Sequence, residues 1–464
     1  MRLDDIKYRL GEFWNDFRKE TAGLVGLGIL AVAIIVMIFE PVIIPYKEAS
    51  TRWRDISYWQ DNAANAAPSW TNIFAAKKSA VTTRLKPHSV SKSDTSPEVV
   101  YEFDYECNYD IGPTDLIVRG EATGTVPLSV TIMRPDGQEI EIVRKVFEGL
   151  SDDIFRASFS NEGRSNLTEY IQRLQSEREN IPFIGDASVT QVLFSSFDGS
   201  DYTRAPVAKG KYVIKVRTLE MEGLATINSI ELVVVGKVSG LMGTDNSKRD
   251  LFSGVIAGLK WAMFIGLLTS VVSVLIGVFY GIIAAYFGGM VDSVMMLIFD
   301  YFISLPVLPI LIVFSAVYKP SIWTIIGALI LFSWVGPVKT IRSMALQIKE
   351  ETYIESAKAL GAGHWRIIFN HMAPLLIPYS FASMALAVPG AIVYESSVSL
   401  LGLGDATIVT WGQILHDALS GGAVLNGLWW WVLPPGLLIA ILGMTFAFIG
   451  FSMDKILHPK LRTR

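Results

Sequence analysis

The stretch "ETYIESAKALGAGHWRIIFNHMAPLLIP", Glu351 to Pro378, is a polar break between long apolar runs. On either side of it, and earlier in the chain, we expect six membrane-spanning helices, because an apolar run of roughly 20 residues suffices to cross the hydrocarbon core. The predicted fold is therefore an α-helical polytopic membrane protein. The expected spans are Thr21–Phe39, Trp261–Tyr286, Ser293–Val317, Ile322–Val338, Leu375–Ser397 and Leu428–Phe451.

Two short helices that meet at a glycine bend are predicted within this stretch. Thr352 and Glu355 have the spacing of a capping box, which begins a helix, and Gly361 suits its end. One face of this helix consists of Tyr353, Ala357 and Leu360. A second helix is expected from about residue 363 to Pro374, with an apolar stripe of Trp365, Ile368, Phe369 and Met372. Two interpretations remain open: an interfacial connector that rests on headgroups, or a docking surface.

Charge is informative here by its position rather than by its total. A net charge of −4 favours no nucleic acid partner, and the 51% hydrophobic composition favours a membrane. Lysines and arginines gather at 2–19, 339–366 and 455–464. Because short loops that keep positive charge are cytoplasmic, we expect a multi-pass plasma membrane protein with both termini and the 351–378 stretch inside the cell.

Between the first two spans, from about Tyr46 to Gly240, the sequence is polar and rich in turns. The segment "PLSVTIMRPDGQEIEIV", which begins at Pro127, predicts a β-hairpin, because apolar residues alternate on both sides of a Pro-Asp-Gly turn. "KGKYVIKVRTLE" and "INSIELVVVG" predict further strands. A helix is predicted by the spacing of Leu167, Tyr170, Ile171 and Leu174. We therefore expect a mainly β domain, placed outside the cell by the charge rule.

Before the first span, the sequence predicts an amphipathic helix that lies on the membrane surface. Its apolar face consists of Leu3, Ile6, Leu10, Phe13 and Phe17. The expected organisation is an amphipathic helix at 1–20, a span at 21–45, an extracytoplasmic insert at 46–242, a membrane core at 243–453 with a cytoplasmic loop at 339–374, and a cytoplasmic tail at 454–464.

The stretch that begins at Glu351 resembles the loop of ABC importer permeases in which a Glu-Ala-Ala sequence is followed by a glycine and later by Ile and Pro. The matching residues are Glu355, Ala357, Gly361, Ile367 and Pro374, with Ser356 in place of the central Ala. Other segments resemble dipeptide and oligopeptide permeases of the C-subunit type: "GTDNSKRD", "AAYFGGMVDSVMM", "ESSVSLLGLGDATIVTWGQIL" and "MDKILHPKLR". The resemblance covers about Gly243 to Arg462, plus the first span.

The resemblance implies a MetI-like, type I ABC importer permease with six transmembrane helices and an inserted extracytoplasmic domain. Such a chain is a non-catalytic subunit of an ATP-driven importer for peptides or short oligosaccharides. A homologous permease subunit would complete the translocation pathway, two ABC ATPase subunits would dock in the cytoplasm, and an extracytoplasmic substrate-binding protein would deliver substrate. The residues implied to couple to the ATPase are Tyr353, Ile354, Glu355, Ser356, Ala357, Leu360 and Gly361.

The sequence departs from the family at several positions. Lys248 stands where the family usually has Gly, Leu297 where it has Arg, and "DATIVT" where a proline-rich run precedes Trp411. The insert is longer than in bacterial members and resembles some archaeal relatives, several of which carry oligosaccharides. Two alternatives stay open: an ion-gradient secondary transporter, and a membrane receptor with an extracellular sensor domain, which would need a larger cytoplasmic output module.

Asp300 and Glu395 fall within or beside apolar runs. An ionised side chain at the centre of a membrane costs about 3 kcal/mol, so neither should face lipid. They are interpreted either as lining the translocation path or as hydrogen-bonding neighbouring helices. If they carried protons, the secondary transporter would be favoured.

The remaining motifs point to no cofactor. Asn166 begins a glycosylation sequon, and no GxxxxGK[ST] phosphate loop is present, so the chain is not expected to hydrolyse ATP. His364 and His371 are seven residues apart without a carboxylate at ligand spacing, which argues against a metal site. Cys107 is the single cysteine and cannot form an internal disulfide, so we expect it to be packed in a core.

Overall fold

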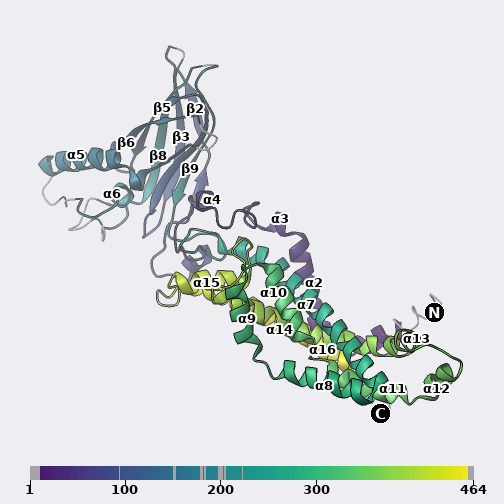
Figure 1. Ribbon diagram of the computed structural model, residues 1–464. Coiled ribbons are helices and arrows are strands. Elements are labelled where there is room, and N and C mark those ends of the chain that lie inside the picture. The colour runs from purple at the N-terminus through teal and green to yellow at the C-terminus, as the bar shows by residue number, and fades with distance from the viewer. Residues whose placement is uncertain are drawn as a thin grey trace. The chain divides into compact units, whose positions relative to one another are not determined.

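The structure is a computed structural model that describes residues 11–93, 95–149, 153–177, 181, 184–196, 202, 205–221 and 223–457. It divides into two compact units. One unit is formed by Met1–Arg54 with Ser253–Arg464 and is helical, and the other, Asp55–Phe252, is rich in β-strands (Figure 1).

In the part of the chain that the structure describes, four helices are long and apolar enough to cross a membrane. They are α2 (Thr21–Ile38), α7 (Leu251–Phe287), the continuous helical stretch His364–Leu400, which ends in α14 (Ala373–Leu400), and α16 (Trp429–Leu457). Each is apolar around most of its circumference, as a helix surrounded by lipid and by other helices requires.

Two further apolar segments are bent helix pairs. One pair joins α8 (Gly289–Ile303) to α9 (Val307–Val317) at an angle of 78°, and the other joins α10 (Ile322–Ser333) to α11 (Val338–Lys349) at 49°. Pro306 and Pro337 lie at these breaks, where proline removes a backbone donor and disfavours a helical residue before it. If each pair is one broken span, the described residues contain six spans, as predicted, but the fourth reaches Lys349 rather than Val338 and so includes the start of the predicted cytoplasmic loop.

The helices of this unit approach closely at small residues. α16 packs against both α2 and α14. A Cβ atom added to Gly26 would lie 2.8 Å from the backbone oxygen of Thr445, and one added to Gly23 would lie 2.8 Å from the side chain of Ser452. Because apolar side chains gain little by leaving lipid for one another, such close backbone approach is what holds membrane helices together.

The described strands of the β-rich unit form two antiparallel sheets. The four-stranded sheet has the order β1 (Thr83–Leu85), β9 (Thr226–Val235), β4 (Asp115–Thr123) and β7 (Asp153–Arg156). The five-stranded sheet has the order β2 (Ser89–Lys92), β3 (Glu98–Cys107), β8 (Gly210–Leu219), β5 (Val126–Met133) and β6 (Glu139–Phe147).

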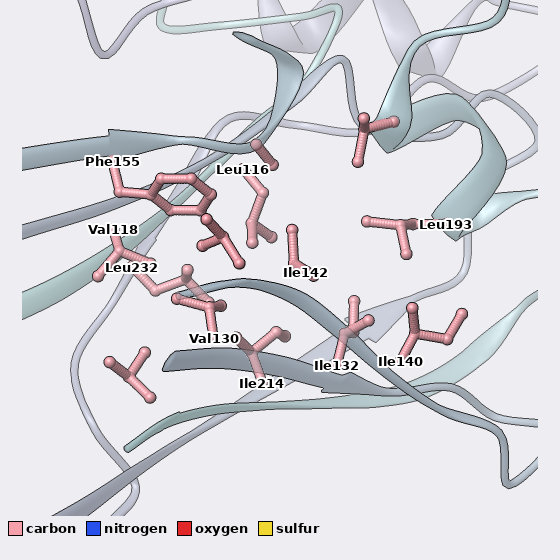
Figure 2. Packing of buried hydrophobic residues seen from close by; sticks show 14 of the residues in the cluster. Leu116, Val118, Val130, Ile132, Ile140, Ile142, Phe155, Leu193, Ile214 and Leu232 are labelled. Atoms are coloured by element: carbon pink, nitrogen blue, oxygen red, sulfur yellow. The ribbon is translucent and has the colours of Figure 1, made fainter. Parts of the chain in front are cut away.

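Inward-pointing apolar side chains of both sheets form one core, part of which Figure 2 shows around Leu116 and Leu232 of one sheet and Val130 and Ile214 of the other. The alternation of buried and exposed residues along β3 and β8 produces this core, because successive side chains of a strand point to opposite faces. Cys107 is a buried free thiol within it, as predicted.

The predicted elements of this unit are confirmed. β5 and β6 pair as the expected hairpin, and Gly137 occupies a left-handed conformation in its turn. β8 and β9 match the two other predicted strands. The predicted helix is α5 (Asn161–Glu177), and its buried face consists of Leu167, Tyr170, Ile171 and Leu174. A second helix, α6 (Val189–Phe194), begins with a capping box formed by Ser188 and Gln191.

Parts of the chain's ends lie outside the described residues. This applies to Leu3, Ile6 and Leu10 of the predicted amphipathic helix and to residues 458–464 of the predicted tail. Residues 11–17 are helical, and Phe17 is buried where its ring approaches Gly23 of α2.

Candidate functional site

The short helix α12 (Thr352–Ala359) presents most of its side chains to the outside. Tyr353, Glu355, Ser356 and Lys358 are exposed or partly exposed, and Leu360, which follows the helix, is 88% exposed. Ile354 is the exception, because it is fully buried in a cluster with residues of α7, α11 and α14. α12 is therefore held to the rest of the unit by one apolar side chain while its outer face is exposed.

The sequence predicts the C-terminal end of α12 correctly and its N-terminal cap incorrectly. The prediction of a capping box at Thr352 and Glu355 is wrong. The backbone carbonyl of Glu351 accepts hydrogen bonds from the N–H groups of Ile354 and Glu355. Glu351 is therefore the N-cap, and Thr352 is already the first helical residue. The Glu351 side chain makes no capping hydrogen bond at this end. The glycine end is confirmed, because Gly361 has φ of +83°, a conformation that glycine adopts without strain.

The second predicted helix does not stop at Pro374. α13 (His364–Ile367) continues through the π-helical turn η3 (Ile368–Met372) directly into α14. Pro374 lies inside this continuous helical stretch, directly after the π-helical turn and at the start of α14. The prediction therefore failed because it treated a tolerated proline as a helix terminator.

The predicted apolar stripe is divided along its length. Ile368 and Met372 are fully buried, whereas Trp365 and Phe369 are exposed and stack on each other with ring centroids 6.0 Å apart. Half of the stripe consequently packs inward, and the other half joins the exposed surface beside α12.

Polar contacts fix this region to the end of α7. The Tyr286 hydroxyl lies 2.9 Å from Nδ1 of His364, and the ammonium of Lys349 donates to the backbone oxygen of Ala285 at 3.2 Å. His364 is thus occupied in a structural contact. The described residues contain no group of His, Cys, Asp and Glu that could hold a metal ion.

Two ion pairs join α8 to α11. Arg342 forms a bidentate pair with Asp292, with its Nε 2.6 Å from Oδ1, and these side chains are 30% and 16% exposed. Asp300 pairs with Lys339 at 3.3 Å, but these side chains are 61% and 65% exposed. The Lys339 ammonium also lies 4.8 Å from the centroid of the Phe299 ring. The structure therefore gives Asp300 a cationic partner.

Glu395 lies in α14 and is only 3% exposed. Its carboxylate accepts a hydrogen bond from Ser399 at 2.8 Å and one from Ser396 at 3.4 Å. The neighbouring helix α15 (Trp411–Ser420) packs closely on this turn, since a Cβ atom at Gly412 would lie 2.7 Å from Ser396. Glu395 and Asp300 lie on different helices and have different partners.

Sequence reasoning missed the contacts of Arg54, at the end of the segment that comes after the first span. Its guanidinium donates to both carboxylate oxygens of Asp417, at 3.1 and 3.2 Å, and to Gln413 at 3.0 Å. Trp53 packs against Gly254 at the start of α7. Arg54 and Asp417 are 363 residues apart in the chain, so no local pattern could have predicted this contact.

Asn166, the predicted sequon residue, lies within α5 and is half-buried. The residues predicted to couple to an ATPase are brought together on one short segment, but neither Asp300 nor Glu395 belongs to it. The exposed surface on and beside α12 is therefore distinct from the two acidic residues, Asp300 and Glu395, which lie in α8 and α14.

Two family models match parts of the chain. The model described as binding-protein-dependent transport system inner membrane component matches residues 277–463. The model described as the N-terminal transmembrane domain of oligopeptide transport permease C matches residues 9–68.

Curated relatives also match this chain. The dipeptide transport system permease protein DppC of Bacillus subtilis is 37% identical over 221 residues, which is 47% of this chain and 68% of that protein. The oligopeptide transport system permease protein OppC of the same organism is 34% identical over 47% of this chain and 72% of that protein. A solved structure of the MetNI methionine ABC transporter in an inward-facing conformation matches with a TM-score of 0.32 and 19% identity, over 46% of this chain and 97% of that one.

Proposed function

Because the chain belongs to the family of binding-protein-dependent transport system inner membrane components, and within it to the dipeptide and oligopeptide permeases, we propose that it forms half of the translocation pathway of an ATP-driven importer. A homologous permease subunit provides the other half. Two ATPase subunits hydrolyse ATP on the cytoplasmic side, and an extracytoplasmic binding protein delivers the substrate.

Peptides are the substrate class that the relatives favour, since the two Bacillus subtilis proteins are named for dipeptide and oligopeptide transport. Short oligosaccharides are the second candidate. Purification of the complex from its native membrane, followed by mass spectrometry of the ligand held by its binding protein, distinguishes the two classes.

The observation that carries the coupling proposal is the one-sided attachment of α12. Ile354 anchors it in the permease core, and its outer face consists of Tyr353, Glu355, Ser356, Ala357, Leu360 and Gly361. ATP can drive transport only if its binding favours one ATPase arrangement and that arrangement contacts the permease differently in two states. α12 supplies this contact.

We expect Glu355→Lys and Gly361→Pro to abolish ATP-dependent uptake in proteoliposomes while leaving membrane insertion unchanged. The first reverses a charge on the exposed face. The second fixes φ near −65° at a residue whose φ is +83°. The matched control is Gly363→Ala, because Gly363 is exposed, has φ of −69°, and has open space around an added Cβ atom.

Uptake and copurification of the ATPase subunits should fall together in the first two variants and stay at the parent level in the control. If a Glu355→Lys protein that inserts into the membrane shows normal uptake, α12 does not couple the permease to the ATPase. The family membership would be unaffected by that result.

Asp300 and Glu395 are proposed as lining or bracing the pathway. The exposed Asp300–Lys339 pair suits contact with water or substrate, and the buried Glu395 suits a brace between α14 and α15. Both chain termini and α12 face the cytoplasm in this proposal, and the β-rich unit faces outward, consistent with the positions of lysine and arginine.

A further inference from the structure

A small loop projects from the β-rich unit with an exposed apolar tip. The 3₁₀-helix η1 (Ser69–Ile73) leads into it. Asn72 closes its base with two hydrogen bonds to the backbone of Ser79, at 2.8 and 3.0 Å. Residues 74–78 are exposed. The side chains of Ile73 and Phe74 are 76% and 80% exposed, so the loop holds large apolar groups in water.

The tip belongs to a larger apolar surface. The Trp70 indole N–H donates to the backbone oxygen of Leu241 at 2.9 Å, and the Trp70 and Phe74 rings lie edge to face with centroids 6.5 Å apart. Leu241 is itself 61% exposed. We define the tip surface as Trp70, Ile73, Phe74 and Leu241.

The exposed charge that follows the tip in the chain is positive, and the acidic residue beside it, Asp110, accepts the backbone N–H of Lys78 at 2.9 Å and pairs with Lys209 at 2.7 Å. The sequence from Ser69 to Lys78 reads "SWTNIFAAKK", with two adjacent lysines and no acidic residue. Long lysine side chains beside an apolar tip can keep their ammonium groups in water while their stems lie along apolar material. An aromatic and aliphatic tip followed by lysines suits the boundary between acyl chains and negatively charged headgroups.

The tip surface is also close in the chain to a membrane helix. Leu241 is two residues from Gly243, whose backbone oxygen accepts the N–H of Leu251 at 3.1 Å. Leu251 is the first residue of α7, which is long and apolar enough to cross a membrane. Leu241 therefore lies ten residues before α7 in the chain, which favours a lipid surface as the partner of the tip surface.

We propose that the tip surface inserts into the lipid headgroup region of the membrane that the same chain spans, with Lys77 and Lys78 contacting anionic headgroups. A neutral protein surface would bind the apolar tip but would add no anionic group for the two exposed lysines, whose acidic neighbour Asp110 is already paired with Lys209. Lipid supplies both the apolar and the anionic component.

The test uses the full chain in nanodiscs. Ala75→Cys places a thiol for an environment-sensitive fluorophore within the tip and leaves Ile73 and Phe74 in place. Cys107 is buried, so the new thiol is labelled selectively. The matched control position is Val90→Cys on β2, which is 51% exposed and outside the tip surface. Nitroxide-bearing lipids quench the fluorophore from the membrane, and iodide quenches it from water.

We expect lipid quenching at position 75 and iodide quenching at position 90, in phosphatidylcholine nanodiscs that contain phosphatidylglycerol. With Phe74→Asp, the fluorophore at position 75 should be quenched by iodide instead of by the nitroxide-bearing lipids. Lys77→Gln with Lys78→Gln should lower the ratio of inserted to free loop by about 25-fold, since each lysine near an anionic surface contributes about fivefold.

Equal iodide quenching at both positions in lipid would overturn the proposal. Shielding at position 75 that develops only after addition of the homologous permease or the binding protein would also overturn it, in favour of a protein partner. Thermal unfolding of each variant shows whether the fold is kept, and a loss of lipid quenching counts only when that transition is unchanged.

Discussion

At the scale of one residue, Lys248 stands where the family usually has glycine, and its contacts show how the chain tolerates this change. Its φ is +67°, a left-handed conformation that costs a residue with a Cβ atom about 1–2 kcal/mol relative to glycine. The family resemblance places glycine at this position. The Lys248 ammonium donates to the backbone oxygen of Gln60 at 3.3 Å, and burial lowers the pKa of Lys248. This contact offsets part of the backbone cost.

We expect Lys248→Gly to change the free energy of unfolding of the β-rich unit by less than about 1 kcal/mol, and Lys248→Val to lower it by about 1–3 kcal/mol. Both variants lose the ammonium contact, so their difference reports the backbone alone, because a β-branched side chain does not fit at positive φ. Thermal unfolding monitored by tryptophan fluorescence measures it. Equal stabilities would contradict the left-handed conformation.

Helices α8 and α11 show at the scale of the element how burial decides the strength of an ion pair. Asp292–Arg342 and Asp300–Lys339 join the same two helices, but the side chains of the first pair are much less exposed to solvent than those of the second. Exposed pairs contribute about 0–1 kcal/mol because solvent screens them and long side chains lose freedom. The first pair should therefore carry most of the coupling between α8 and α11.

A double-mutant cycle of Asp292→Asn and Arg342→Gln should give a coupling free energy of about 1–3 kcal/mol in unfolding of the purified protein. The matched cycle of Asp300→Asn and Lys339→Gln should give about 0–1 kcal/mol. Similar values for the two cycles would show that burial does not distinguish these pairs.

Elements also show where local rules fail. The sequence predicts a helix end at Pro374 and one stripe from Trp365 to Met372, whereas the helix continues through a π-helical turn into α14 and only Ile368 and Met372 of the stripe are buried. The turn forms where Ile367, Ile368 and Met372 pack into the cluster that holds Ile354. The buried side of the stripe packs against residues of α7 and α11, which a helical pattern does not contain.

At the scale of the whole molecule, the segment that enters the β-rich unit and the segment that leaves it are hydrogen-bonded to each other. The backbone of Ala67 bonds both Lys237, at 3.2 Å, and Ser239, at 2.9 Å, and the N–H of Asn65 donates to Asp245 at 2.8 Å. Residues 68–237 can therefore be replaced by a short linker without separating the segments that lead to the membrane helices.

We expect this excised protein to insert and to bind the ATPase subunits normally. Its affinity for the binding protein should fall at least about tenfold, which corresponds to about 1.4 kcal/mol, if the insert is the platform for that protein. The excision keeps Trp53 and Arg54, whose contacts lie within the helical unit. Surface plasmon resonance measures the affinity, and unchanged affinity with unchanged uptake would reduce the insert to a spacer.

Local properties of the sequence were enough to identify the class of this protein, because apolar length, charge position and strand alternation act directly on how each segment meets water or lipid. The apolar segments, the β-hairpin and the glycine end of α12 were predicted in this way and confirmed. The permease family was predicted from the resemblance of several short segments to known permeases, and it is also confirmed. The extracytoplasmic position of the insert stays a prediction.

Packing between distant segments settled which side chains face inward on the 351–378 stretch, which cation accompanies Asp300, and what Arg54 contacts. It also set the exposure of the tip surface from Trp70 to Leu241. These features depend on residues far apart in the chain, and a sequence pattern records only near neighbours. Only the folded chain brings such residues within hydrogen-bonding or van der Waals distance.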